Sequence, residues 1–339
     1  MTSQVHPIEP PKTERDLGPD FVKGVAIVLM LYGHVTFLGT TADAQKALVS
    51  CIYLFHMPLF LVISGYYFFP KGPLLDVLKK LCRRLVIPYV IFQAIYLILL
   101  HQAYQHGFQT NNSLPKLDGQ ILAATLLLHP VGGYWFLHTL VIYQACLLLV
   151  LGVFRDRIRG IFALVALIFA LVQWGGLSFS YTNGAFLLFG YFLRVARFDL
   201  PKEVWLSTVA VVLLLLGLSE PQIRESFPLR FSLVFAVLAL LLGICRAPVL
   251  RLPVLIFSFL GVNSLLILVF HAFALNLAKF AQRPLLQWDS TGIGYAIFSV
   301  GCAIGLSIVA GWVIDRLRLS PWIFGVRQCV RGVSGAANA

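Results

Sequence analysis

His34 lies at the end of an apolar run, residues 21–32, that is typical of a membrane-spanning helix. An imidazole in hydrocarbon costs free energy unless it has a partner or faces a cavity, so an ionisable residue at this depth is a functional candidate. Lys23 precedes it by eleven positions, which is about 16 Å along a helix. The pair therefore suits a reaction in which a charged donor stays at the membrane surface while its reactive end reaches a base inside.

Two roles are open for the His34 side chain. It can be a packing residue that hydrogen-bonds to a neighbouring helix, as many intramembrane polar residues are. It can instead be a general base, since a positioned base contributes about 10²–10⁴-fold to proton transfer from a hydroxyl. For a lone histidine in an apolar run, the residues alone leave both roles open.

The composition indicates a polytopic membrane protein. Of the 339 residues, 59% are hydrophobic and 12% are charged, about half of the charged fraction usual in globular proteins. The net charge of +12 does not indicate nucleic-acid binding, because the basic residues fall between apolar segments, where they set orientation. We expect an all-α bundle of ten spans, near 21–39, 47–69, 85–101, 134–154, 160–174, 182–196, 203–219, 229–245, 254–278 and 292–314.

The distribution of charge predicts the orientation of this bundle. Most of the 26 Lys and Arg residues lie in loops on the same side as the N-terminus, so the positive-inside rule places both termini in the cytoplasm. We expect a flexible tail over 1–20, a transmembrane domain over 21–315 and a cytoplasmic C-terminal tail over 316–339. The six cysteines show no spacing suited to zinc or to a disulfide framework, and we expect no bound metal or cofactor.

Five motifs occur in order along the chain. They are Asp20 to Gly24 with Gly33-His34; Phe55 to Phe60 with Ser64-Gly65-Tyr66; Lys79 to Tyr89; Tyr134 to Leu137; and Leu260 to Leu265 with His271. Their order and spacing resemble the acyltransferase-3 family of integral membrane acyltransferases, particularly the bacterial branch that O-acetylates exopolysaccharides and sugars. The resemblance covers roughly residues 16–315.

The resemblance implies an enzyme that transfers an acyl group other than an aminoacyl group. It implies an acetyl group taken from cytoplasmic acetyl-CoA and a hydroxyl acceptor on a polysaccharide or lipid-linked oligosaccharide. Such an enzyme contacts membrane lipid and no nucleic acid, and it resides in the bacterial cytoplasmic (inner) membrane as a multi-pass protein. His34 matches the family's histidine, and Lys23 stands where the family pattern has Arg, which keeps the charge and loses bidentate pairing.

A basic group before the third span is the expected donor site. Lys80, Arg83 and Arg84 recur at i, i+3 and i+4, so a regular helix would present them on one face. With Lys23, that face suits the phosphates of coenzyme A. The same residues also serve the positive-inside rule, and both roles can hold together.

Five further residues are candidates for the acceptor side or the cavity. Each also has a structural alternative: interhelical hydrogen bonding for the polar ones, and interface anchoring for the tryptophan. The candidates are Trp135, His138, Asn263, Ser264 and His271. His56 with Pro58 is better explained by a bend in the second span, and Ser64-Gly65 by close helix packing.

Two other functions compete with the enzyme. One is a transporter or flippase that uses the same cavity for binding, although intramembrane carboxylates, which proton coupling favours, are scarce. The other is a membrane protein that keeps the fold without chemistry. Acetyl-CoA hydrolysis by the purified protein separates the first function from these two.

Overall fold

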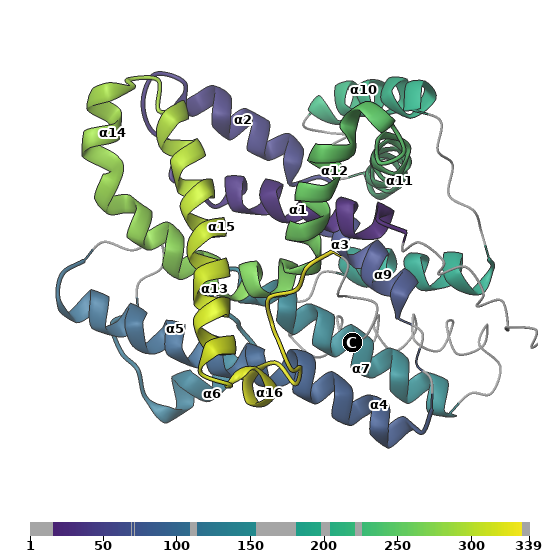
Figure 1. The fold of residues 1–339 in the computed structure, drawn as a ribbon, viewed down its shortest axis with the longest axis horizontal. Helices are drawn as coiled ribbons and strands as arrows, with labels where there is room; N and C mark the ends of the chain where they lie inside the picture. Colours follow the sequence, from purple (N-terminus) through teal and green to yellow (C-terminus); the bar gives the residue numbers. More distant parts are fainter. Residues whose placement is uncertain are drawn as a thin grey trace, which may run out of the picture.

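The computed structural model describes residues 16–68, 70, 72–108, 114–153, 181–197, 204–220 and 226–333 (Figure 1). Within these ranges the regular structure is helical, and they contain no strand. The α-helices are α1 (Gly18–Gly33), α2 (Ala42–Ile52), α3 (His56–Tyr67), α4 (Leu74–Leu81), α5 (Ile87–Gln105), α6 (Gly119–Leu127), α7 (Tyr134–Val153), α9 (Tyr181–Val195), α10 (Val204–Ser219), α11 (Phe227–Ile244), α12 (Arg251–Val262), α13 (Ser264–Ala278), α14 (Gln282–Trp288), α15 (Ile293–Arg316) and α16 (Ser320–Ile323). A π-helical turn covers Cys82–Val86, and short 3₁₀ turns cover Pro248–Leu250 and Lys279–Ala281.

The expected all-α membrane bundle is confirmed at this level. The described ranges contain five helices long and apolar enough to cross a membrane, or six if the bent pair α11–α12 is one span. Large apolar side chains are exposed on α10 and α15, for example Leu213 and Ile297, as expected for helices that face lipid. The ten spans and the position of the termini stay predictions, and the span expected at 160–174 lies outside the described residues.

Three predicted spans differ from the helices observed. The span expected over 47–69 is divided at residues 53–55 into α2 and α3, which together form one candidate span. The helix expected over 21–39 ends at Gly33, and the chain continues without helix until α2 begins at Ala42. The span expected over 254–278 is divided at Asn263 into α12 and α13. Here α12 pairs with α11 across a bend of 88°, whereas α13 continues through the 3₁₀ turn into α14 as one candidate span. Hydropathy alone did not detect these interruptions, because apolar residues continue the run past each helix end, as Val35, Phe37 and Leu38 do after Gly33.

Glycines allow two pairs of helices to approach closely around the centre of the bundle. A Cβ on Gly24 of α1 would lie 1.7 Å from the carbonyl oxygen of Phe257 in α12, and a Cβ on Gly261 would lie 1.8 Å from that of Asp20. In the same way, Gly65 of α3 packs on the backbone of α9, which confirms the packing role expected for this glycine. Small residues at crossings let membrane helices associate through backbone contacts. As a result, α1 packs against α3, α11, α12 and α13 in the interior (Figure 1).

The chain folds back onto the bundle after α15. The described part of the predicted C-terminal tail, residues 316–333, therefore packs against the helices. Asp315 near the end of α15 accepts hydrogen bonds from the backbone N–H of Cys329 (2.8 Å) and of Val330 (3.0 Å), and from the Ser320 hydroxyl. Ser320 and Cys329 are buried, and the Phe324 ring stacks on the ring of Phe92 in α5. This segment, residues 319–331, therefore belongs to the folded domain.

Candidate active site

His34 is the residue at which α1 ends. Its backbone has φ −96° and ψ 0°, outside the helical region, and Val35 continues as irregular chain. Irregular backbone at membrane depth is tolerated only where it is buried in protein or lines a cavity, because lipid offers no hydrogen bonds. This condition is met at His34, whose side chain lines two cavities.

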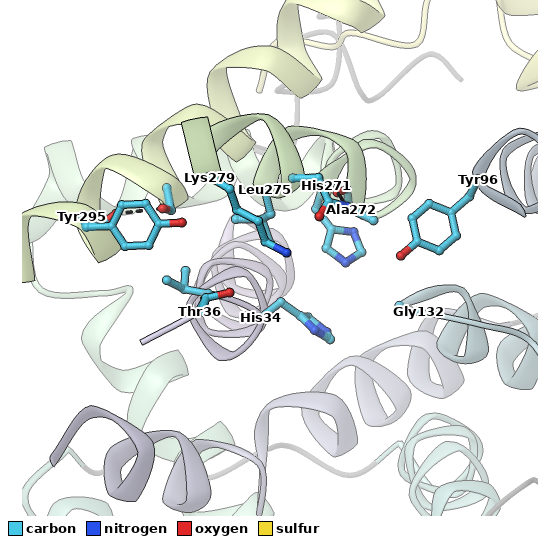
Figure 2. A pocket seen from close by; sticks show the side chains of 13 residues that line it. His34, Thr36, Tyr96, Gly132, His271, Ala272, Leu275, Lys279 and Tyr295 are labelled. Carbon is cyan, nitrogen blue, oxygen red and sulfur yellow. Dashed lines mark hydrogen bonds between the residues drawn. The ribbon is translucent and has the colours of Figure 1, made fainter. Parts of the chain in front are cut away.

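The first cavity, which we call the Lys279 cavity, has a volume of about 320 Å³. Its polar lining consists of the two imidazoles of His34 and His271, the amine of Lys279 and several hydroxyls (Figure 2). Figure 2 shows Lys279 extending from the end of α13 toward the space between the two histidines. The remaining lining residues are Val35, Thr36, Tyr96, Gly132, Gly133, Ala272, Leu275, Asn276, Tyr295 and Ser299.

The second cavity, which we call the Arg230 cavity, has a volume of about 350 Å³. Its lining combines His34 with the indole of Trp135 and the guanidinium of Arg230. The other lining residues are Met30, Tyr53, His56, Met57, Pro58, Gly133 and Leu268. The position of Trp135 brings one predicted acceptor-side residue next to the predicted base.

His271 is the second predicted residue that the structure brings to His34. The two ring centroids are 5.2 Å apart, and the His271 side chain is buried. Nδ1 of His271 lies 2.6 Å from the carbonyl oxygen of Leu268. Because a carbonyl only accepts, Nδ1 carries the proton, so Nε2 is an acceptor when the ring is neutral. The contact thus fixes both the tautomer and the orientation of the ring.

Gly133 makes room for the His271 ring. A Cβ at this position would lie 2.4 Å from Cε1 and 2.6 Å from Nε2 of His271. The following residue, Tyr134, is buried and donates its hydroxyl to the carbonyl of Val269 at 2.7 Å, which fastens the start of α7 to α13. A side chain at residue 133 would therefore displace the imidazole or separate the two helices.

The turn between α14 and α15 holds the irregular segment that follows His34. The backbone of Thr40 donates to Ser290 O at 3.0 Å, and the Thr41 hydroxyl donates to Thr291 O at 2.8 Å. Asp289 fixes this turn, because its carboxylate accepts bonds from the Thr291 hydroxyl and from two backbone N–H groups. These bonds lower the pKa of Asp289 below its usual value. The turn thus restrains the segment that carries the histidine.

A third cavity, which we call the Lys23 cavity, lies toward the opposite end of α1. It has a volume of about 320 Å³ and is lined by one carboxylate, Asp20, and three cations: Lys23, Arg84 and Arg331. The Lys23 amine also lies 5.7 Å from the centroid of the Tyr67 ring. Such a concentration of positive charge suits a polyanionic ligand.

Asn263 joins the C-terminal segment to the Lys23 cavity. Its amide nitrogen donates to Arg331 O at 2.9 Å, and its amide oxygen accepts from Arg331 N at 2.9 Å. This two-bond contact holds the backbone of Arg331 at the break between α12 and α13. Asn263 and Ser264 both line the Lys23 cavity, so the structure places them at the predicted donor end and not beside His34, where we expected acceptor residues.

The basic group before the third span is divided by the π-helical turn Cys82–Val86. A π turn contains more residues than an α turn, so the regular α-helical spacing assumed for these residues does not hold through it. Arg84 is half-buried and lines the Lys23 cavity, whereas Lys80 and Arg83 are exposed and do not line it. Of the three basic residues expected at the donor site, the structure brings only Arg84 to the cavity that Lys23 lines.

His138 lies apart from the three cavities. Its Nε2 is 3.0 Å from the carbonyl oxygen of Leu127, and its ring packs beside Tyr89. These contacts join α7 to the end of α6 and to α5, which is a structural role. His138 is not among the residues that line the cavities around His34.

Sequence reasoning did not select three cations that line these cavities: Lys279, Arg230 and Arg331. Arg230 and Lys279 had a visible signal, since each adjoins a long apolar run, and we assigned them only to topology. Arg331 had none, because it meets Asn263 across 68 positions of sequence. In the part of the chain that the structure describes, no group of three or more His, Cys, Asp or Glu could hold a metal ion.

Comparison with known families shows to which family the chain belongs. A family model described as an acyltransferase domain matches residues 16–312, which is most of the 339 residues. The chain belongs to the acyltransferase-3 family. The resemblance inferred from the five ordered motifs is thereby confirmed, and with the apolar helices it indicates a membrane acyltransferase.

Two curated relatives match parts of the chain. Nodulation protein NolL of Sinorhizobium fredii is 31% identical over 134 residues, which is 36% of this chain and 33% of that protein. Nodulation protein NolL of Mesorhizobium japonicum is 46% identical over 56 residues, or 15% of each chain. The chain thus matches a third or less of the length of these relatives. No solved structure matches it.

Proposed function

We propose that this acyltransferase-3 protein moves acetyl from cytoplasmic acetyl-CoA to a hydroxyl of a lipid-linked or exported bacterial polysaccharide, such as an exopolysaccharide, capsule or O-antigen. The observation that carries the proposal is the position of His34. It lies where α1 ends and lines two cavities, and a cation-rich cavity lies toward the other end of α1. A base and an anion site about 16 Å apart suit a donor with charged phosphates and a long neutral arm.

The Lys23 cavity is the proposed donor site. Coenzyme A carries a pyrophosphate and a further phosphate, and the cations of Lys23, Arg84 and Arg331 meet at this cavity. Charge-assisted hydrogen bonds to phosphate are about twice as strong as neutral ones. The phosphates would stay at this end, and the thin pantetheine arm would carry the thioester toward His34.

The chemical step is a direct transfer at His34. The acceptor hydroxyl oxygen attacks the carbonyl carbon of the acetyl thioester while the His34 imidazole takes the hydroxyl proton. The carbon–sulfur bond then breaks, and the departing thiolate of coenzyme A receives that proton. The products are an acetyl ester and free coenzyme A. His271, 5.2 Å from His34 between ring centroids, would act as a positioning residue through its fixed tautomer.

The acceptor would enter from the face opposite the donor. The Lys279 and Arg230 cavities are lined by residues at the ends of apolar runs that the charge distribution places away from the cytoplasm. Aromatic rings and hydroxyls, including those of Trp135, Tyr96 and Tyr295, are suited to a sugar. This arrangement agrees with a multi-pass enzyme of the bacterial cytoplasmic membrane that acetylates a polysaccharide on its outer side.

Loss of Arg84 should weaken the donor site specifically. In Arg84→Gln we expect the KM for acetyl-CoA to rise about tenfold or more, with a smaller change in kcat, because a charge-assisted contact to phosphate is lost. The measurement is acetyl-CoA consumption by the purified full-length protein in lipid nanodiscs with polysaccharide present. Lys80→Gln is the matched control, since it removes an exposed charge four residues earlier that does not line the cavity.

Three outcomes of this assay contradict the proposal in different ways. Absence of acetyl-CoA consumption by the wild-type protein would favour a transporter or a protein without chemistry. An equal increase of KM in both variants would mean that these basic residues attract the donor through their overall charge and not through a specific contact of Arg84. An unchanged KM in Arg84→Gln would remove the Lys23 cavity as the donor site.

A further inference from the structure

Arg230 places its guanidinium in a cavity that the proposed base, His34, also lines. It lies near the start of α11, in the run Phe227-Pro-Leu-Arg-Phe-Ser-Leu-Val, and shares a cavity with His34 and Trp135. The Nε atom of its guanidinium is buried. An arginine in a membrane-spanning helix is expensive and usually faces the interior for a functional reason. The position is therefore a candidate for ligand recognition.

The lining of the Arg230 cavity has the composition of an anion site. None of its lining residues among those described is acidic, and the same holds for the adjoining Lys279 cavity. A guanidinium presents a planar set of donors that matches a carboxylate or a phosphate bidentately. With a volume of about 350 Å³, the cavity falls in the range of small-molecule sites.

We propose that the Arg230 cavity binds the anionic group of the acceptor, so that the acceptor is an acidic or phosphorylated sugar. This inference rests on the proposed function and names its substrate class. The guanidinium of Arg230 holds the carboxylate or phosphate, the indole of Trp135 packs on the sugar ring, and a hydroxyl of that ring faces His34.

Lys279 supplies an independent observation in the same direction. Its amine extends from the end of α13 into the other cavity that His34 lines (Figure 2). Each cavity at His34 is therefore lined by one cation: Arg230 of α11 in one, and Lys279 of the turn after α13 in the other. Among the described residues, neither cavity is lined by a carboxylate. An anionic acceptor is attracted to these two cations from either cavity.

The test is direct binding, without an acyl donor, to purified full-length protein in lipid nanodiscs. The probes are methyl glucuronide, glucosyl phosphate and neutral methyl glucoside, titrated by calorimetry. We expect at least one anionic probe to bind the wild-type protein about tenfold to a hundredfold more tightly than the neutral glycoside. Preference for the glucuronide would indicate a uronic acid, and preference for the phosphate would indicate a phosphorylated or lipid-phosphate-linked sugar.

Variants at Arg230 assign the preference to this residue. In Arg230→Gln the anionic and neutral probes should bind with nearly equal affinity, whereas Arg230→Lys should keep part of the preference because the charge remains. Arg246→Gln removes an exposed charge just after the other end of α11 and should leave the preference unchanged. Thermal unfolding of each variant shows that it is folded.

Two results would overturn the inference. One is equal binding of charged and neutral probes by the wild-type protein. This result does not depend on whether any variant folds. The other is an undiminished preference in folded Arg230→Gln. Because the titration contains no acetyl-CoA, it is separate from the transfer assay. Acetyl transfer without anionic preference would overturn only this inference, whereas anionic preference without transfer would overturn only the proposed reaction.

Discussion

A His34→Ala variant should lose acetyl transfer by about two to four orders of magnitude, because a positioned general base contributes that much to reaction of a hydroxyl. Its amount in the membrane should stay at the wild-type level. The His34 side chain borders two cavities, so removing it enlarges existing space and leaves the helix contacts of α1 intact. The measurement is incorporation of labelled acetyl from acetyl-CoA into polysaccharide by equal amounts of each protein.

His101→Ala is the matched control for that loss. His101 lies on α5, where its Nδ1 is 3.0 Å from the carbonyl oxygen of Leu114, and it borders neither cavity at His34. We expect this variant to retain transfer. Wild-type incorporation by a well-expressed His34→Ala protein would remove His34 as the base, and an equal loss in both variants would point to folding instead of chemistry.

Gly24→Ala should have the largest effect on stability. A single added methyl group would lie 1.7 Å from the carbonyl oxygen of Phe257, and neither backbone can yield without separating α1 from α12. Overpacking of this kind typically costs about 1–3 kcal/mol. We therefore expect a lower yield of folded protein and a lower Tm, measured by heating the purified protein and following the monodisperse fraction.

Gly301→Ala provides the comparison for this stability loss. Gly301 lies within α15, and a Cβ there would meet no atom within 4 Å. Alanine in the middle of a helix is favoured over glycine by roughly 0.5–1 kcal/mol, so Gly301→Ala should be neutral or slightly stabilising. A Tm of Gly24→Ala equal to that of Gly301→Ala would contradict the close crossing of α1 and α12.

Local sequence was sufficient to predict the class of fold and to single out His34 as a candidate residue. Long apolar runs predicted helices, and the polar residues His34 and His271 were visible in them. The end of α1 at Gly33 and the division at Asn263 were not predicted from hydropathy, and Asn263 is bonded to a C-terminal segment that only the folded chain brings near it. Hydropathy averages over such short breaks, so it reports the span and not its interruption.

The predicted donor residues show the same limit. Lys23 and Arg84 meet at one cavity as expected, whereas Lys80 and Arg83 are exposed and do not line it, and a π turn interrupts the regular helix between them. A helical wheel assumes uniform winding, so a local change of register defeats it. Arg331 joins the cavity because Asp315 and Asn263 hold the returning chain, which is tertiary information that no local pattern contains.

The most direct measurement is an experimental structure of the full chain with coenzyme A bound. We expect the phosphates of the nucleotide against Lys23, Arg84 and Arg331, and the pantetheine sulfur directed toward His34. Phosphates bound instead at the exposed Lys80 and Arg83, with the Lys23 cavity empty, would contradict the donor site. A sulfur directed away from His34 would contradict the central claim that acetyl is transferred there.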